Sequence, residues 1–179
     1  AGRLHELKVM DDPVFSQGLM GVGFAIEPTD GRVYAPVSGK VTMVAKTKHA
    51  VGLRTVTGVE VLLHLGIDTV ELDGRPFELM VKVGEQVVAG QVLVRMDLTM
   101  IKEVHKVPTV ITVVTNSTAL QAQLFLKSEA GLVQPHVPVA MVTTLEEASP
   151  AMTSSATGQT GAYTQLATQI IQGVGGRDN

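Results

Sequence analysis

Val81 to Val94 has the sequence Val-Lys-Val-Gly-Glu-Gln-Val-Val-Ala-Gly-Gln-Val-Leu-Val. Short runs of valine and leucine separated by glycines at close intervals are typical of β-strands joined by tight turns. Ala35 to Val44 has the same texture, with the sequence Ala-Pro-Val-Ser-Gly-Lys-Val-Thr-Met-Val. Because this texture runs from about residue 3 to residue 145, we predict an all-β domain over residues 1–145, built as an antiparallel β-sandwich or barrel-sandwich.

One short helix is expected inside this domain. The segment Asp97-Leu-Thr-Met-Ile-Lys-Glu-Val-His105 interrupts the strand texture. Asp97 or Thr99 is a suitable N-cap, because a short polar side chain accepts a hydrogen bond from a backbone amide of the first turn.

Two further segments follow the β domain. Glu146 to Ala162 consists of small and polar residues with too little apolar surface to offset the entropy of ordering, so we predict a flexible linker. From Tyr163 to Val174, apolar residues recur at i, i+3, i+4, i+7, i+8 and i+11 and are followed by two glycines. This pattern indicates one C-terminal amphipathic helix, either folded back on the β domain or opening a second domain. The length of the linker favours a second domain.

Composition excludes several classes of protein. The chain has 179 residues with 14 basic and 17 acidic side chains and a net charge of −3, and it lacks the basic run that nucleic-acid binding needs. The absence of cysteine excludes disulfides, thiolate metal sites and a cysteine nucleophile within this sequence. No apolar run is long enough to cross a membrane, and no signal peptide is recognisable. We therefore expect a piece of a longer cytosolic protein.

Histidines are the remaining candidates for chemistry. In the strand-like segment from Thr57 to Val70, alternation places Glu60, Leu62 and His64 on one face. A turn at residues 55–58 would pair this strand with the preceding one and bring His49 close to His64. A lone histidine is more often an ordinary core or edge residue, but two that pair next to a Gly-Ile-Asp sequence also fit a reactive site.

The segment His64-Leu-Gly-Ile-Asp-Thr-Val-Glu-Leu72 resembles the active-site signature of the glucose-type IIA domain of the bacterial phosphoenolpyruvate-dependent sugar phosphotransferase system. The resemblance covers about residues 1–145 and implies an antiparallel β-sandwich that carries a phosphohistidine. Further segments match in the family's order: Asp12–Ser16, Met20–Gly21, Ala35–Gly39, Thr47–Ala50, Gly84–Val87 with Gly90, and Pro108–Ile111 with Asn116.

The resemblance implies a phosphotransferase mechanism. It makes His64 the phosphoryl acceptor and His49 the group that stabilises the phosphate, with the Thr47 hydroxyl orienting the His49 ring. It also places Asp12 and Asp68 at the rim of the site, where carboxylates can hold an arginine of a partner. Turn and cap residues are the alternative interpretation of both aspartates.

The implied partners bind in turn and leave quickly, which calls for a modest apolar docking patch. The donor is the small carrier protein HPr, and the acceptor is a cysteine of a IIB domain. Asp12, Val14, Phe15, Val22 and Leu62 are the implied partner-binding residues, each of which could equally belong to the core, together with Leu19 and Met20. The family commonly has Asp where this chain has Val22, and Asn where it has Lys48.

Residues 163–179 resemble the opening helix of the IIB domain of the same system. This resemblance implies the order IIA, linker over 146–162, and IIB, with a membrane IIC domain in the same permease. The full protein is then expected on the cytoplasmic face of the cell membrane. The sugar is not encoded here, because the IIC domain selects it.

Two other classes of protein need a sequence feature that this chain lacks. A lysostaphin-like zinc peptidase needs a His-x-His pair, which this sequence lacks. A lipoyl-like barrel-sandwich module needs a modifiable lysine in a Met-Lys or Asp-Lys dipeptide, and neither occurs. We expect no required cofactor, although zinc could bind at His49 and His64 together with a carboxylate from a partner.

Overall fold

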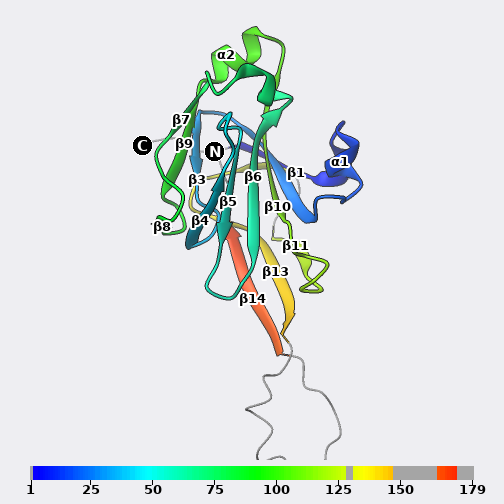
Figure 1. The fold of residues 1–179 in the computed structure, drawn as a ribbon. Helices are drawn as coiled ribbons and strands as arrows, with labels where there is room; N and C mark the ends of the chain where they lie inside the picture. Colours follow the sequence, from blue (N-terminus) through cyan, green and yellow to red (C-terminus); the bar gives the residue numbers. More distant parts are fainter. Residues whose placement is uncertain (1, 128–130, 147–164, 173–179) are drawn as a thin grey trace, which may run out of the picture.

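The computed structural model describes residues 2–127, 131–146 and 165–172, and these ranges form three antiparallel sheets (Figure 1). The largest sheet contains, in spatial order, β12 (Gly131–Val133), β1 (Gly2–Glu6), β2 (Val22–Pro28), β10 (Val107–Val114), β6 (Glu60–Ile67), β5 (Ala50–Arg54), β4 (Gly39–Val44) and β8 (Gln86–Val87). The second contains β3 (Arg32–Tyr34), β9 (Val92–Met96) and β7 (Phe77–Leu79). The third contains β11 (Gln123–Leu126), β13 (Pro138–Glu146) and β14 (Gln165–Gln172).

Four short helices interrupt the strands within the described ranges. They are the 3-10 helices η1 (Leu7–Val9) and η2 (Thr69–Leu72) and the α-helices α1 (Pro13–Ser16) and α2 (Leu98–Glu103). The predicted helix near residue 100 is therefore confirmed, and its cap is Asp97, whose side chain accepts a hydrogen bond from the Met100 amide at 3.0 Å. The prediction of an antiparallel all-β domain is confirmed as well.

The main core lies between the large sheet and the β3-β9-β7 sheet. Leu53, Leu63 and Leu65 of the large sheet are completely buried in one cluster with Val33 and Leu93 of the smaller sheet. Alternation along β6 places Val61, Leu63 and Leu65 in this core and leaves Leu62 and His64 on the opposite face. The sandwich therefore presents His64 on the outer face of its large sheet.

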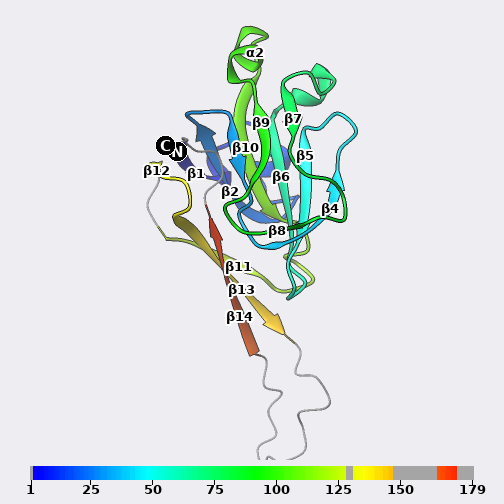
Figure 2. The ribbon, with the colours of Figure 1, turned by 90° about the vertical axis from the view of Figure 1, so that its left-hand side faces the viewer.

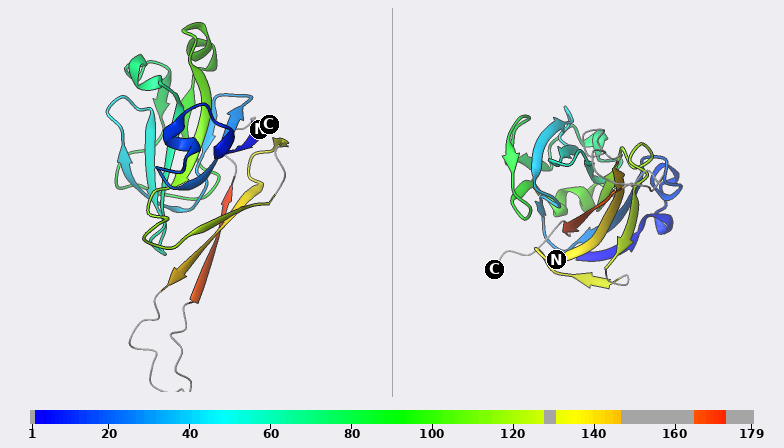
Figure 3. Two further views of the ribbon diagram at one scale, coloured as in Figure 1. Left: turned by 90° about the vertical axis from the view of Figure 1, so that its right-hand side faces the viewer. Right: turned by 90° about the horizontal axis from the view of Figure 1, so that it is seen from below.

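A second, smaller apolar cluster covers the opposite face of the large sheet. Leu7 of η1 and Phe15 of α1 pack there against Ala25, Ile111 and Val113. Figures 1 and 3 show α1 lying to the side of β2 and β10, away from β3, β7 and β9. Because both faces of β10 are covered, its residues from 109 to 114 are all buried, which explains the uninterrupted Thr-Val-Ile-Thr-Val-Val sequence.

The C-terminal helix prediction is wrong for residues 165–172. These residues form β14, which pairs antiparallel with β13 from Glu146↔Gln165 to Pro138↔Gln172 (Figure 2). The physical reason is that β13 offers backbone hydrogen bonds, whereas a single short helix without a packing partner is marginal in water. β-branched Thr168, Ile170 and Ile171 also suit a strand. The predicted linker, apart from Glu146 at the end of β13, and the ends of the predicted helix lie outside the described residues.

Thr112 on β10 gives a test of the core. Its side chain is 1% exposed, and its hydroxyl oxygen has no hydrogen-bond partner among the described residues. Because an unpaired buried hydroxyl is costly, Thr112→Val is expected to raise the free energy of unfolding by about 1 kcal/mol in urea denaturation. The matched control is Thr69→Val, which removes a buried hydroxyl that is hydrogen-bonded and should lower this free energy. An equal loss of stability in both variants would contradict the prediction.

Candidate functional site

A hairpin brings the two candidate histidines together. β5 and β6 pair antiparallel, with Ala50 opposite His64, and the Leu65 amide donates to the His49 carbonyl at 2.7 Å. The two imidazole rings lie with centroids 5.3 Å apart and planes at 77°. The predicted pairing of these strands and the predicted proximity of the rings are therefore confirmed.

His64 is half-buried in an apolar recess. Its neighbours across the two adjacent strands are Ala50 and Ile111, both buried. Phe15 of α1 contacts the imidazole, with ring centroids 5.1 Å apart. Phe15 therefore packs against the ring, and hydrogen bonds orient the polar edge of the ring.

The orientation of His64 comes from its own strand end. Nδ1 lies 2.7 Å from the carbonyl oxygen of Gly66. A carbonyl only accepts, so neutral His64 carries its proton on Nδ1 and donates it to Gly66. Nε2 is then left without a proton and with a free lone pair, which is the form a nucleophile needs.

His49 is oriented by the turn that precedes β5. The Lys48 amide donates to the Ala45 carbonyl at 2.8 Å, and Thr47 Oγ1 lies 2.5 Å from His49 Nδ1. If the threonine hydroxyl donates, Nδ1 accepts and the ring proton sits on Nε2. The predicted contact between Thr47 and His49 is present, and it can make His49 Nε2 a hydrogen-bond donor.

The pKa of each imidazole is lowered, which favours the neutral form of both rings. Burial lowers the pKa of His49, and a positive charge on His64 would lower it further. Burial also lowers the pKa of His64, and this effect outweighs the opposing influence of the Gly66 carbonyl and of the Asp12 and Asp68 charges. Because both pKa values are lower in the folded protein than in the unfolded chain, the two histidines bind fewer protons in the folded protein.

This difference predicts how stability depends on pH. The contribution of the two histidines to stability is fully present above about pH 6.5, the ordinary histidine pKa, and is lost as pH falls below it. We expect the free energy of unfolding to decrease on acidification from pH 7 to pH 5, and to decrease less in the double variant His49→Gln/His64→Gln. Urea denaturation at each pH provides the measurement. Identical pH dependence in the two proteins would refute the prediction.

The two predicted aspartates lie beside one cleft. It has a volume of about 830 Å³, and Asp12, Val14 and Asp68 contribute to its wall with Met10 and Ile67. The Asp12 side chain also caps α1 by accepting from the Val14 amide at 2.9 Å, so Asp12 serves as a cap in addition to lining the cleft. Asp68 is exposed and adopts a left-handed conformation, with φ of 57°, before η2.

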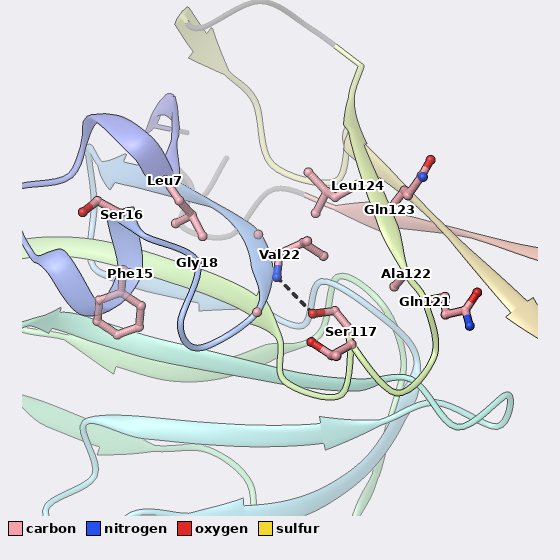
Figure 4. Close-up of a pocket in the computed structure, with 13 residues that line it drawn as sticks. Leu7, Phe15, Ser16, Gly18, Val22, Ser117, Gln121, Ala122, Gln123 and Leu124 are labelled. Carbon is pink, nitrogen blue, oxygen red and sulfur yellow. Dashed lines mark hydrogen bonds between the residues drawn. The ribbon is translucent and has the colours of Figure 1, made fainter.

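The other implied partner-binding residues divide between surface and core. Val14 is 43% exposed, whereas Phe15 is only 5% exposed and supports His64 rather than projecting from the surface. Val22 and Leu62 are half-buried. Phe15 and Val22 line a second cleft of about 580 Å³, where the Val22 amide donates to Ser117 Oγ at 3.3 Å (Figure 4).

Reasoning from the residues missed two contributors to the site. The Gly66 carbonyl that fixes His64, and the burial of Phe15 against the same ring, depend on contacts that side-chain chemistry alone does not reveal. Gly66 itself is visible in the sequence and could have indicated a special backbone conformation after His64. The structure shows this conformation as a φ of 82°, which is unfavourable for other residues.

The described part of the chain contains no group of three or more His, Cys, Asp or Glu residues arranged to hold a metal ion. Zinc at His49 and His64 would therefore need a further ligand from elsewhere. Of the other histidines, His5 lines the same cleft as Asp12 and Asp68 and pairs with Glu27 at 2.9 Å, whereas His105 and His136 lie in turns with positive φ.

A family model described as "phosphoenolpyruvate-dependent sugar phosphotransferase system, EIIA 1" matches residues 1–120. The chain belongs to this EIIA family. Family membership makes it a phosphotransferase component of the sugar phosphotransferase system that acts through a phosphohistidine. The peptidase and lipoyl-like alternatives receive no support.

Individual EIIA relatives agree with this assignment. The glucose-specific EIIA component of Staphylococcus epidermidis is 45% identical over 116 residues, which are 65% of this chain and 70% of the relative. The glucose-specific EIICBA component of Streptococcus pneumoniae is 44% identical over 121 residues, which cover 68% of this chain but only 17% of that longer protein. The structure of glucose permease IIA from Mycoplasma capricolum matches with a TM-score of 0.66 and 38% identity, over 78% of this chain and 88% of that one.

The S. pneumoniae protein is an EIICBA component, so an EIIA domain of this family occurs fused to EIIC and EIIB. Among the residues that the structure describes, no helix has the length and apolar character needed to cross a bilayer.

Proposed function

We propose that this EIIA domain carries the phosphoryl group on Nε2 of His64. The observation that supports this most directly is the Nδ1 hydrogen bond to Gly66, which leaves Nε2 as the nucleophilic nitrogen. The lowered pKa keeps this nitrogen unprotonated near neutral pH. The nearby His49 ring gives the phosphoryl group a second contact.

The reaction consists of two in-line transfers of the phosphoryl group. The first exchanges one N–P bond for another, and the second exchanges an N–P bond for an S–P bond. His64 Nε2 attacks the phosphorus of phospho-HPr, a new N–P bond forms, and the N–P bond of the donor breaks with its electron pair returning to the donor imidazole. In the second half-reaction, a cysteine thiolate of IIB attacks the same phosphorus and His64 leaves as neutral imidazole. Little covalent chemistry is required of the protein, so positioning and charge stabilisation carry the catalysis.

His49 supplies the charge stabilisation in this proposal. With the Thr47 hydroxyl donating to Nδ1, the Nε2–H of His49 can donate to a phosphoryl oxygen on His64. Thr47 therefore fixes both the ring orientation and the tautomer of His49.

Asp12 and Asp68 are proposed to hold a cationic side chain of the partner. Both are close enough for their charges to raise the pKa of His64, so both act on the space where the phosphate would sit. A carboxylate repels phosphate, but it attracts an arginine that can then neutralise the transferring group. The cleft beside these residues gives such a side chain access.

HPr as donor and a fused or separate IIB domain as acceptor are the proposed partners. Val14 and Leu19, which are 43% and 71% exposed, supply apolar contact area beside the half-buried Val22 and Leu62. A IIC domain would place the complete permease at the cell membrane, with this domain on its cytoplasmic face. The glucose-specific relatives make glucose the first sugar to test.

We further propose that the EIIA domain ends near residue 145. The length of the match to the glucose-specific EIIA component of Staphylococcus aureus, 142 residues at 39% identity and 85% of that component, suits a domain of about this size. Residues 146–162 would then be the linker, and residues 163–179 the start of IIB. The IIB assignment rests on the sequence resemblance alone. It does not include the predicted helix, because residues 165–172 form the strand β14.

The test is phosphorylation of the chain with phosphoenolpyruvate, Enzyme I and HPr, followed by ¹⁵N and ³¹P NMR. We expect one acid-labile, base-stable phosphate, bonded to Nε2 of His64. Phosphate on Nδ1, on another residue or absent altogether would overturn the proposal. Omission of HPr is the matched control, because it removes only the immediate donor.

A further inference from the structure

The two-residue segment Leu65–Gly66 connects both histidines. The amide of Leu65 donates to the His49 carbonyl, and the carbonyl of Gly66 accepts from His64 Nδ1. A rotation of this short segment would therefore move the Leu65 amide away from the His49 carbonyl. It would also move the Gly66 carbonyl, which sets the tautomer of His64.

Gly66 cannot hold this geometry unaided. Its φ of 82° is easily adopted by glycine, but glycine is equally free to leave it. The conformation must therefore be stabilised by contacts from outside the segment.

Thr69 makes those contacts from two sides. Its side chain is completely buried, and its hydroxyl donates to the Leu65 carbonyl. Its methyl group lies directly against Gly66, since a Cβ placed on Gly66 would come within 2.5 Å of Thr69 Cγ2 and 2.8 Å of the Val107 carbonyl oxygen. A threonine supplies both the hydroxyl and the methyl, which no smaller residue does.

We propose that Thr69 is a positioning residue for phosphoryl transfer. It holds the backbone of Leu65 and Gly66 in place, so that the Gly66 carbonyl keeps the proton of His64 on Nδ1. This inference rests on the proposed role of His64. Thr69 itself does not touch the phosphate, and it acts through the backbone.

The experiment compares Thr69→Val, which keeps the shape but removes the hydroxyl, with Thr69→Ser, which keeps the hydroxyl. The first readout is the ¹⁵N NMR tautomer state of His64 in the unphosphorylated protein. We expect Thr69→Val to move part of the His64 population to the Nε2–H tautomer. Thr69→Ser loses the methyl contact but keeps the hydroxyl bond to the Leu65 carbonyl, so it should retain more of the Nδ1–H form than Thr69→Val. The second readout is single-turnover phosphorylation by phospho-HPr, which should slow on the order of tenfold to a hundredfold in Thr69→Val only.

Thr112→Val is the matched control, because it makes the same chemical change at another buried position of the same sandwich. It should leave the tautomer and the transfer rate unchanged. If Thr69→Val does not fold, Thr69→Ser and Thr69→Ala give the same comparison. An unchanged His64 tautomer in the hydroxyl-free variant would overturn the inference. Failure of the wild-type protein to accept phosphate would instead overturn the proposed function. The two failures are distinguishable, because the tautomer of His64 is measured in the unphosphorylated protein.

Discussion

His64→Gln is expected to reduce phosphoryl acceptance from phospho-HPr by more than about a thousandfold, because it removes the nucleophile. The glutamine amide has no nitrogen lone pair comparable to that of imidazole Nε2, although its size and polarity suit the half-buried recess beside Phe15. Rapid-quench measurement with radiolabelled phospho-HPr follows the first half-reaction directly.

The matched control for this variant is His105→Gln, which changes an exposed histidine in a turn and should accept phosphate at the wild-type rate. Unfolding curves establish that both variants are folded. Retention of a stable phosphate by His64→Gln would show that the acceptor has been assigned to the wrong residue.

His49→Gln is expected to separate the two half-reactions. Acceptance from HPr should stay within a few-fold of wild type, because the nucleophile and its Gly66 hydrogen bond are intact. Transfer onward to IIB should slow on the order of a hundredfold, the usual consequence of losing one donor that stabilises transition-state charge. Glutamine offers an amide donor, but its reach and direction differ from those of an imidazole held by Thr47.

The companion variant is Thr47→Val, which leaves the His49 ring in place and removes the hydroxyl that fixes its tautomer. It should impair onward transfer in the same direction but less severely, because part of the His49 population still carries its proton on Nε2. If His49→Gln blocks acceptance as completely as His64→Gln, the division of roles between the two histidines is wrong.

Strand parity was sufficient to predict the core of the site. Alternation along residues 60–65 sends three leucine and valine side chains inward and therefore His64 outward, whatever the rest of the fold does. The tight turn before Val59 makes β5 and β6 neighbours, so the proximity of His49 to His64 depends only on local sequence. A sequence pattern can reveal contacts between residues that are close together in the sequence.

Contacts between distant segments could not be predicted in this way. Phe15 belongs to a helix of four residues, and only its packing with Ile111 and Val113 reveals that it lies against the His64 ring. The error at β14 has the same origin. A spacing of i, i+3 and i+4 describes an amphipathic helix only when no strand edge competes for the backbone, and β13 provides one.

At Lys48, the departure from the family pattern concerns backbone conformation. Its φ is 59°, a left-handed conformation that asparagine tolerates better than lysine. The asparagine common in the family therefore suits the turn that carries Thr47 and His49. The lysine here gives no sign of a new chemical role.

The pairing order of the large sheet has a consequence for synthesis on the ribosome. β2 ends at Pro28, and its inner neighbour β10 begins only at Val107, about 80 residues later. At the usual pace of translation, roughly 4–16 s pass between the two strands. During that interval the nascent chain exposes one unpaired edge of β2, the kind of edge that recruits the wrong strand. The outer edge of β1 stays unpaired for longer still, because its partner β12 ends only at Val133.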